Sequence, residues 1–151
     1  LADVYLLYAE ATAVVGGRDG KSSKCSLTSV DAINKLRDRV GAGHVDASFT
    51  GNAYMDEIRR ERAVELMFEG HRFNDLRRWL LLTEYPYNIK TVQRFDRAQP
   101  LDKEADPKEN KVLNWDEETL VTRNLDAKHY WLPINTDDVQ MYPEFTQNPG
   151  W

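Results

Sequence analysis

Acidic and basic side chains alternate between residues 61 and 78, and paired carboxylates are the first chemistry that this pattern offers. A glycoside hydrolase needs two carboxyl groups about 5–9 Å apart across an open cleft, with the pKa of one raised so that it acts as an acid. Here every acid has an arginine close by, and an arginine favours the ionised form of its neighbour. We therefore predict a structural ion-pair motif and no enzyme activity. Its members are Glu61, Arg62, Glu65, Glu69, Arg72, Asp75 and Arg78.

Three aromatic residues next to predicted loops give the only positive signal for binding. They are Tyr85, Tyr87 and Trp115. Sugar rings pack their apolar C–H faces on flat aromatic side chains, which supply contact area at low entropic cost. The same residues would equally anchor long loops on the helices, and we favour that structural interpretation over a glycan-binding one.

Metal and cofactor chemistry finds little support in the sequence. His44, His71 and His129 are far apart in the sequence, and none has a second ligand in a metal-type spacing. The acids of the 102–118 stretch lack the ordered spacing of a cation-binding loop. Cys25 lies in a polar, serine-rich segment without an adjacent base. We expect no metal and no cofactor.

Four helices are expected to position the charged motif. Their predicted ranges are 2–15, 28–40, 52–69 and 71–82. Thr28 is a suitable N-cap with Asp31 three residues later. In the third helix, the helical period puts Ile58, Arg62 and Leu66 on one apolar stripe, so Arg62 should be buried and paired. The other predicted apolar faces are Val30, Ile33, Leu36 and Val40, and Phe73, Leu76 and Leu80.

The rest of the chain is predicted to be irregular. We expect a short strand within 87–95, a charged loop over 96–118, and a strand at 119–122 that pairs with 129–134. Asn135 or Thr136 should cap a short helix through Val139. The tail, with Phe145 and Trp151, is expected to lie over the helices. The predicted fold class is mainly α, with tetratricopeptide-like packed helix pairs followed by a long irregular segment with a small β-hairpin.

The run E-R-x-x-E-L-x-F-E-G-x-R-x-x-D-L-x-R-W, which starts at Glu61, resembles the signature of the SusD/RagB family. The opening ADVYLLYAEA, the WLPI segment at Trp131 and the closing QNPGW resemble the family's flanking segments, in family order. The resemblance implies that the chain is the C-terminal part of a single SusD-like domain. Residues 1–82 would be its helical scaffold and 83–151 a loop-rich tail.

The resemblance also implies a function. SusD-like proteins are non-catalytic lipoproteins on the extracellular face of the outer membrane, and they deliver oligosaccharides to a SusC-like TonB-dependent transporter. The lipid anchor and most glycan contacts are then expected in an N-terminal portion that this chain lacks, and the charged motif is expected to be scaffold. Some members of the family are suited to peptides rather than glycans.

Composition and hydropathy argue against a nucleic-acid-binding protein and against a membrane-spanning helix. The net charge is −5, which leaves no basic stripe for nucleic acid. No apolar run approaches the roughly 20 residues that span a bilayer. Two other functions stay open: a helical-repeat adaptor that binds peptides in a groove, and a glycoside hydrolase that uses the acidic helix. Replacing Glu65 by Gln would separate them, because a hydrolase would lose turnover whereas a structural ion pair would lose stability.

Overall fold

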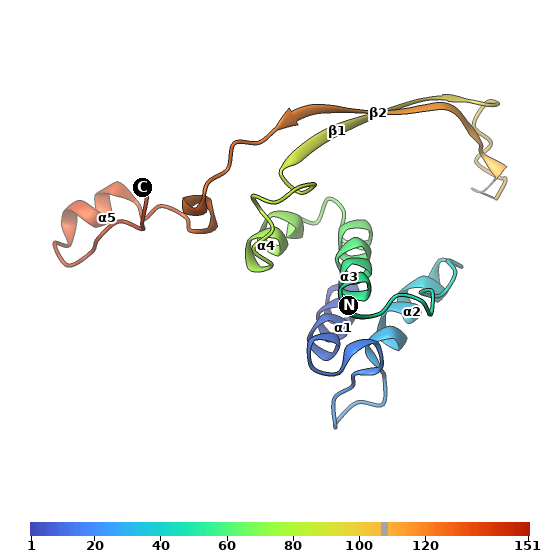
Figure 1. Cartoon of the computed structure of the whole chain (residues 1–151), viewed down its shortest axis with the longest axis horizontal. Coiled ribbons are helices and arrows are strands. Elements are labelled where there is room, and N and C mark those ends of the chain that lie inside the picture. Colours follow the sequence, from blue (N-terminus) through green and yellow to red (C-terminus); the bar gives the residue numbers. More distant parts are fainter. Residues whose placement is uncertain (107–108) are drawn as a thin grey trace. The chain divides into compact units, whose positions relative to one another are not determined.

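The computed structural model describes residues 1–106 and 109–151 of the chain. The chain forms two compact units, Leu1–Arg72 and Phe73–Trp151. The first unit contains the helices α1 (Ala2–Gly16), α2 (Ser29–Arg39) and α3 (Gly51–Glu65), with the short 3-10 helix η1 (Gly17–Asp19) after α1. Helix α1 packs against both α2 and α3 (Figure 1).

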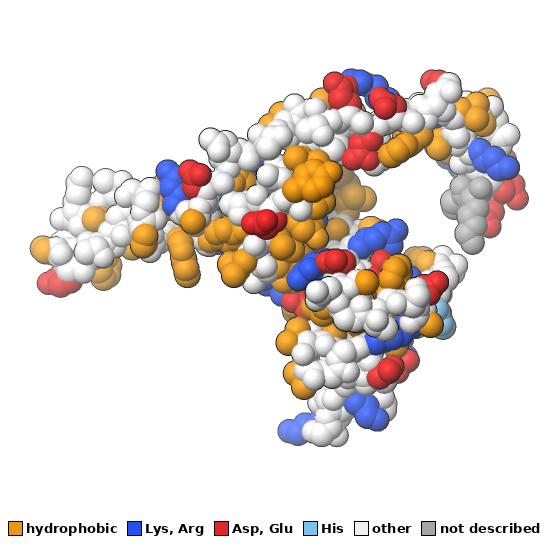
Figure 2. All heavy atoms as spheres, viewed as in Figure 1, with side chains coloured by type: hydrophobic (Ala, Val, Ile, Leu, Met, Phe, Trp, Pro, Cys, Tyr) orange, Lys and Arg blue, Asp and Glu red, His pale blue; other side chains and the backbone are white. Residues whose placement is uncertain are grey.

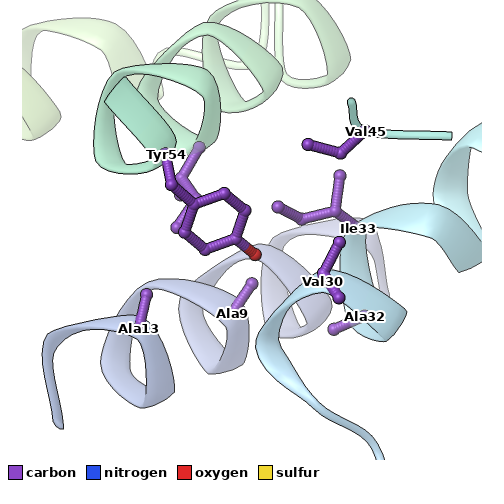
Figure 3. Close-up of a cluster of buried hydrophobic side chains, with 8 residues drawn as sticks. Ala9, Ala13, Val30, Ala32, Ile33, Val45 and Tyr54 are labelled. Carbon is purple, nitrogen blue, oxygen red and sulfur yellow. The ribbon is translucent and has the colours of Figure 1, made fainter. Parts of the chain in front are cut away.

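Small side chains let the three helices approach closely around one large one. Figure 3 shows Tyr54 of α3 lying against Ala9 and Ala13 of α1. The Tyr54 hydroxyl is 2.8 Å from the Ser29 hydroxyl, which donates to the Ala9 carbonyl oxygen at 2.7 Å. Burial raises the pKa of Tyr54, although the Ser29 hydrogen bond acts in the opposite direction. The whole buried cluster comprises Ala9, Ala13, Val30, Ala32, Ile33, Val45, Tyr54 and Ile58.

Helix α2 begins where the sequence predicts. Thr28 is its N-cap: the Thr28 side chain accepts a hydrogen bond from the Asp31 backbone, and the Asp31 carboxylate accepts one from the Thr28 backbone. Hydrogen bonding of the Asp31 carboxylate with the side chain and the backbone N–H of Thr28 lowers the pKa of Asp31. Val30, Ile33 and Leu36 are buried as predicted. Val40 is exposed, because α2 ends at Arg39 and the predicted face ran one residue too far.

The predicted third helix was too long. Helix α3 has Thr50 rather than Asn52 as its N-cap and ends at Glu65 instead of continuing to Glu69. Residues 66–70 form turns, in which Phe68 has φ 68° and Gly70 has φ 78°. A right-handed helix cannot pass through these angles. The apolar stripe is nevertheless confirmed, because Ile58, Arg62 and Leu66 are all buried.

The second unit contains a hairpin and two short helices, the first of which begins at His71, two residues inside the first unit. Helix α4 (His71–Arg78) ends earlier than predicted, and only Leu76 of its predicted apolar face is buried, whereas Phe73 and Leu80 are exposed. The strands β1 (Ile89–Arg97) and β2 (Val112–Thr122) form an antiparallel pair (Figure 1). After the hairpin come the 3-10 helix η3 (Ala127–Tyr130) and helix α5 (Thr136–Met141), whose N-cap is Asn135 as predicted.

The hairpin corrects two expectations. Strand β2 begins inside the stretch predicted as a loop over 96–118, of which residues 107 and 108 lie outside the described part. Strand β2 pairs with β1 and not with the predicted partner 129–134. The first two residues of that stretch, 129 and 130, belong to η3. Both strands are largely exposed, so no buried face imposed an alternating pattern that the sequence could reveal.

The predicted fold class is confirmed: the structure is mainly helical with one small two-stranded antiparallel sheet among the described residues. The division of the chain at residue 82 into scaffold and tail stays a prediction. None of the helices described is both long enough and apolar enough to cross a membrane.

Candidate functional site

One face of α3 carries carboxylates that arginines of α2 bind. Arg37 donates to the Glu61 carboxylate from Nε at 3.0 Å and from Nη2 at 2.7 Å, and Nη2 also contacts Glu57. All three side chains are largely buried. Burial alone would lower the pKa of Arg37, but the hydrogen bonds to Glu61 and Glu57 outweigh it and raise the pKa. Glu61 therefore has its described partner on α2, not among the arginines of the predicted motif.

Arg62 and Glu65 also contact earlier helices. The Arg62 guanidinium, with 2% of its side chain exposed, lies 3.0 Å from the Asp3 carboxylate of α1. Glu65 accepts from Arg39 of α2 at 2.6 Å, and the Arg39 side chain is 60% exposed. The Arg62–Asp3 pair connects residues 59 positions apart in the sequence, and helical spacing could not reveal it.

The second half of the predicted motif is arranged differently. The buried Asp75 carboxylate accepts from Arg78 Nε at 2.9 Å, and the Arg78 guanidinium lies 4.7 Å from the centre of the Trp79 ring. Glu69 lies in the turns after α3, and Arg72 lies in α4. An arginine binds each of the carboxylates at 57, 61, 65 and 75, which favours a structural role over acid–base catalysis. The scaffold assignment of the motif itself stays a prediction.

The three aromatic candidates for glycan binding occupy different places in the second unit. Tyr85 is highly exposed in a turn, and Tyr87 is partly buried just before β1. Trp115 is not in a loop: it lies on β2 with 56% of its surface exposed. The register pairs Asp116 with Arg94 and Thr122 with Ile89, so Trp115 lies several positions along the ribbon from Tyr87.

Sequence reasoning missed an aromatic neighbour of Trp115. Phe95 lies on β1 at the irregularity between Arg94 and Asp96, across from the segment that contains Trp115. Both rings are about half exposed. The partial alternation of apolar residues in the 87–95 stretch was a signal for Phe95. The pairing with Trp115 could not be seen, because the sequence predicts a loop where β2 lies.

Sequence reasoning also missed a surface hollow in the second unit, which we call the Trp131 hollow. Its volume is about 410 Å³. It is lined by Asn74, Arg77, Arg78, Leu80, Tyr130 and Trp131. Arg77 joins its two walls, donating to the Tyr130 carbonyl oxygen from Nε at 3.0 Å and from Nη2 at 2.6 Å. The Tyr130 hydroxyl in turn lies 3.2 Å from the Thr83 hydroxyl.

The C-terminal tail holds the Trp131 backbone in place. Trp151 donates from its indole nitrogen to the carbonyl oxygens of Lys128 and Trp131, both at 3.1 Å. The Gln147 side chain bonds both backbone groups of Ile134, at 2.7 and 2.9 Å. These described contacts attach the tail to residues 128–134, whereas the sequence suggested that it lies over helices. Hydrophobic side chains remain on the surface around α5 (Figure 2).

A second hollow, in the first unit, has a volume of about 440 Å³ and is lined in part by Tyr5, Leu36, Arg39 and Glu65. Its arginine and its glutamate bind each other, so the pair presents little net charge to a ligand. Among the residues that the structure describes, no three histidine, cysteine or acidic side chains converge as a metal site requires.

Comparisons with known proteins give one consistent match. The family model for the SusD family matches residues 1–151. No curated protein matches the sequence. Among solved structures, a SusD-like protein from Bacteroides fragilis NCTC 9343 is 25% identical with a TM-score of 0.69, and the match covers 99% of this chain and 24% of that one. Selenomethionine BT4246 is 27% identical with a TM-score of 0.68, and the coverage is the same. The chain thus spans about a quarter of the length of these structures.

Proposed function

Because the chain belongs to the SusD family, we propose that this protein captures oligosaccharides at the cell surface and delivers them, uncleaved, to a partner transporter. The observation that carries the proposal is the family match over residues 1–151, which includes the charged run from Glu61 to Trp79. A role in glycan binding and nutrient uptake is general in this family. The partner in the proposal is a SusC-like, TonB-dependent channel of the outer membrane, and the protein is a lipoprotein on the extracellular face.

The contacts around α3 support capture without cleavage. A general acid must stay protonated near neutral pH, and enzymes achieve this by burying a carboxyl group away from positive charge. Glu57, Glu61 and Glu65 instead accept hydrogen bonds from arginines. Their geometry suits structural ion pairs between helices. The mechanism that we propose is reversible binding through aromatic stacking and hydrogen bonds.

The first experiment is binding of the intact protein to a panel of purified polysaccharides, with release of reducing ends measured in the same samples. We expect saturable binding to at least one glycan class and no release above that of a protein-free control. Release that Glu65→Gln abolishes while the protein stays folded would establish a hydrolase instead. Binding of peptides but of no glycan would support the peptide-binding adaptor.

The delivery step needs a test of its own. The intact protein, expressed together with a SusC-like channel from the same organism, should co-purify with that channel from outer membranes after mild detergent extraction. Removal of the proposed lipid anchor should abolish the membrane association. Recovery of the unaltered protein in the soluble fraction, without a channel, would contradict both the partner and the location that we propose.

Aromatic substitutions address where the glycan binds. Weaker binding of the glycan by Tyr85→Ala or Trp115→Ala would assign a contact to that exposed ring, against the loop-anchoring role that the sequence favours. Tyr87→Ala serves as the partly buried comparison. If all three variants bind with unchanged affinity, these rings anchor the loop and the hairpin, and the contact residues lie elsewhere.

A further inference from the structure

We propose that the Trp131 hollow binds an anionic sugar residue, with the Trp131 indole under the ring and the Arg77 guanidinium beside its acidic group. This proposal rests on the glycan-capture function proposed above and specifies the class of sugar. The hollow's volume of about 410 Å³ falls in the range of small-ligand sites. Its lining combines an aromatic surface with a few polar groups, as sites for small polar ligands do.

The charge of Arg77 is the main argument. Its described partners are all neutral: the Tyr130 carbonyl oxygen and the Phe73 ring, whose centre lies 5.6 Å from the guanidinium carbon. The neighbouring Arg78 differs, because its Nε binds the Asp75 carboxylate. Within the described part of the chain, no acidic side chain pairs with Arg77, although the residue is partly buried. An anion in the hollow would supply the missing opposite charge.

The Arg77 guanidinium is also held in position for such a ligand. Two of its nitrogens, Nε and Nη2, are used for Tyr130, and this leaves Nη1 for a ligand oxygen. Because two bonds fix the plane of the group, binding costs little side-chain entropy. Asn74 adds an amide that both donates and accepts hydrogen bonds, as sugar hydroxyl groups require.

Trp131 supplies the stacking surface. It is 60% exposed, whereas its backbone carbonyl oxygen is bound by the Trp151 indole nitrogen. A flat ring that is open to solvent, with an anchored backbone, is suited to the apolar face of a sugar ring. Leu80, which is also exposed, extends the apolar surface on the α4 side of the hollow.

A carboxylate or a sulfate would both fit this chemistry, and the test separates them. The probes are polygalacturonate and its carboxyl-reduced neutral form, and dextran sulfate with unmodified dextran. We expect the intact protein to bind at least one acidic glycan about tenfold or more tightly than its neutral counterpart, the effect of one charge-assisted hydrogen bond. Raising the salt concentration should reduce this preference.

Variants assign the preference to the hollow. Arg77→Gln should abolish the preference for the acidic glycan and leave neutral glycan binding intact, whereas Arg77→Lys should retain part of it. Trp131→Ala should weaken binding of both forms, and Trp131→Phe should restore much of it. Arg94→Gln, which removes an exposed arginine of the hairpin, is the matched charge control and should change neither.

The outcomes are distinguishable. Neutral glycan binding without any acidic preference would overturn this proposal and leave the proposed function standing. Absence of binding to every glycan would overturn both. If Arg77→Lys and Arg77→Gln lower the melting temperature equally and change both affinities in parallel, Arg77 is a structural link to Tyr130, and the proposal fails.

Discussion

Each of the two units is stabilised internally by a different kind of interaction. Among the described residues, all buried hydrophobic side chains except Leu76 and Leu82 lie in Leu1–Arg72. The unit Phe73–Trp151 relies instead on hydrogen bonds from side chains to backbone groups, such as those from Arg77 to Tyr130 and from Trp151 to Lys128. Apolar burial is the dominant favourable term in folding, whereas a hydrogen bond that water can replace contributes about 1 kcal/mol. Stability should therefore concentrate in the first unit.

Cavity formation gives the largest expected contrast. Ile58→Ala removes a fully buried side chain of α3 and should lower the free energy of unfolding by about 3–4 kcal/mol. The matched change Leu120→Ala, on the exposed β2, should cost less than about 1 kcal/mol. Chemical denaturation followed by circular dichroism measures both. Equal losses would mean that the hairpin is as important to folding as the helical core.

Ion pairs extend the contrast to charged residues. Arg62→Ala leaves Asp3 without its described partner and opens space in the core, and should cost about 3 kcal/mol. Arg94→Ala breaks the exposed pair with Glu118 and should cost about 0.5 kcal/mol. High salt should reduce the second effect more than the first, because exposed charges are screened more strongly. A loss below about 1 kcal/mol for Arg62→Ala would show that its pair contributes no more than a surface pair.

The Tyr54 hydroxyl tests the polar part of the core. Tyr54→Phe removes the hydrogen bond to Ser29 and should cost about 1 kcal/mol near neutral pH. Because burial raises the pKa of Tyr54 in the folded state, the unfolded state loses its proton first as the pH rises. This contribution is complete below about pH 10, the ordinary tyrosine value, and is lost above it. The gap between wild type and variant should therefore narrow above pH 10, and a gap that widens would contradict burial of the hydroxyl.

Helix caps give the smallest contrast. Thr28→Ala removes the cap of the eleven-residue α2 and should cost about 1 kcal/mol, whereas Asn135→Ala at the six-residue α5 should cost less. The lowered pKa of Asp31 adds a pH dependence. Its contribution is present above the ordinary carboxyl pKa, near 4, and is lost as the pH falls through the lower value of the folded state. Asp31→Asn should flatten stability curves at acidic pH, and unchanged curves would contradict the capping box.

Features set by neighbours in sequence could be predicted, and features set by distant residues could not. The Thr28 cap and the buried stripe with Arg62 follow from spacings of three and four residues. The partners of Arg62 and Glu61, which are Asp3 and Arg37, belong to other helices, and one sequence alone does not show which helices become neighbours. The motif was therefore predicted to pair within itself.

The second unit was harder to predict for another reason. Its strands bury no continuous face, so the acids at 116–118 looked like part of a loop. The end of α3 was also hard to predict, because Phe68 adopts a left-handed backbone conformation that glycine or asparagine usually occupies. The Trp131 hollow brings together residues about fifty positions apart, and the sequence does not show that the charged run and the WLPI segment meet.

The anchored indole of Trp151 is one of four tryptophan chromophores that are unevenly distributed along the chain. All four tryptophans, at positions 79, 115, 131 and 151, lie in Phe73–Trp151, and the first unit has tyrosine as its largest aromatic side chain. Selectively excited tryptophan emission therefore monitors only the second unit, whereas far-ultraviolet ellipticity is dominated by α1, α2 and α3. Coincident transitions by the two signals would show that the units unfold cooperatively, and separate midpoints would give each unit its own stability without any substitution.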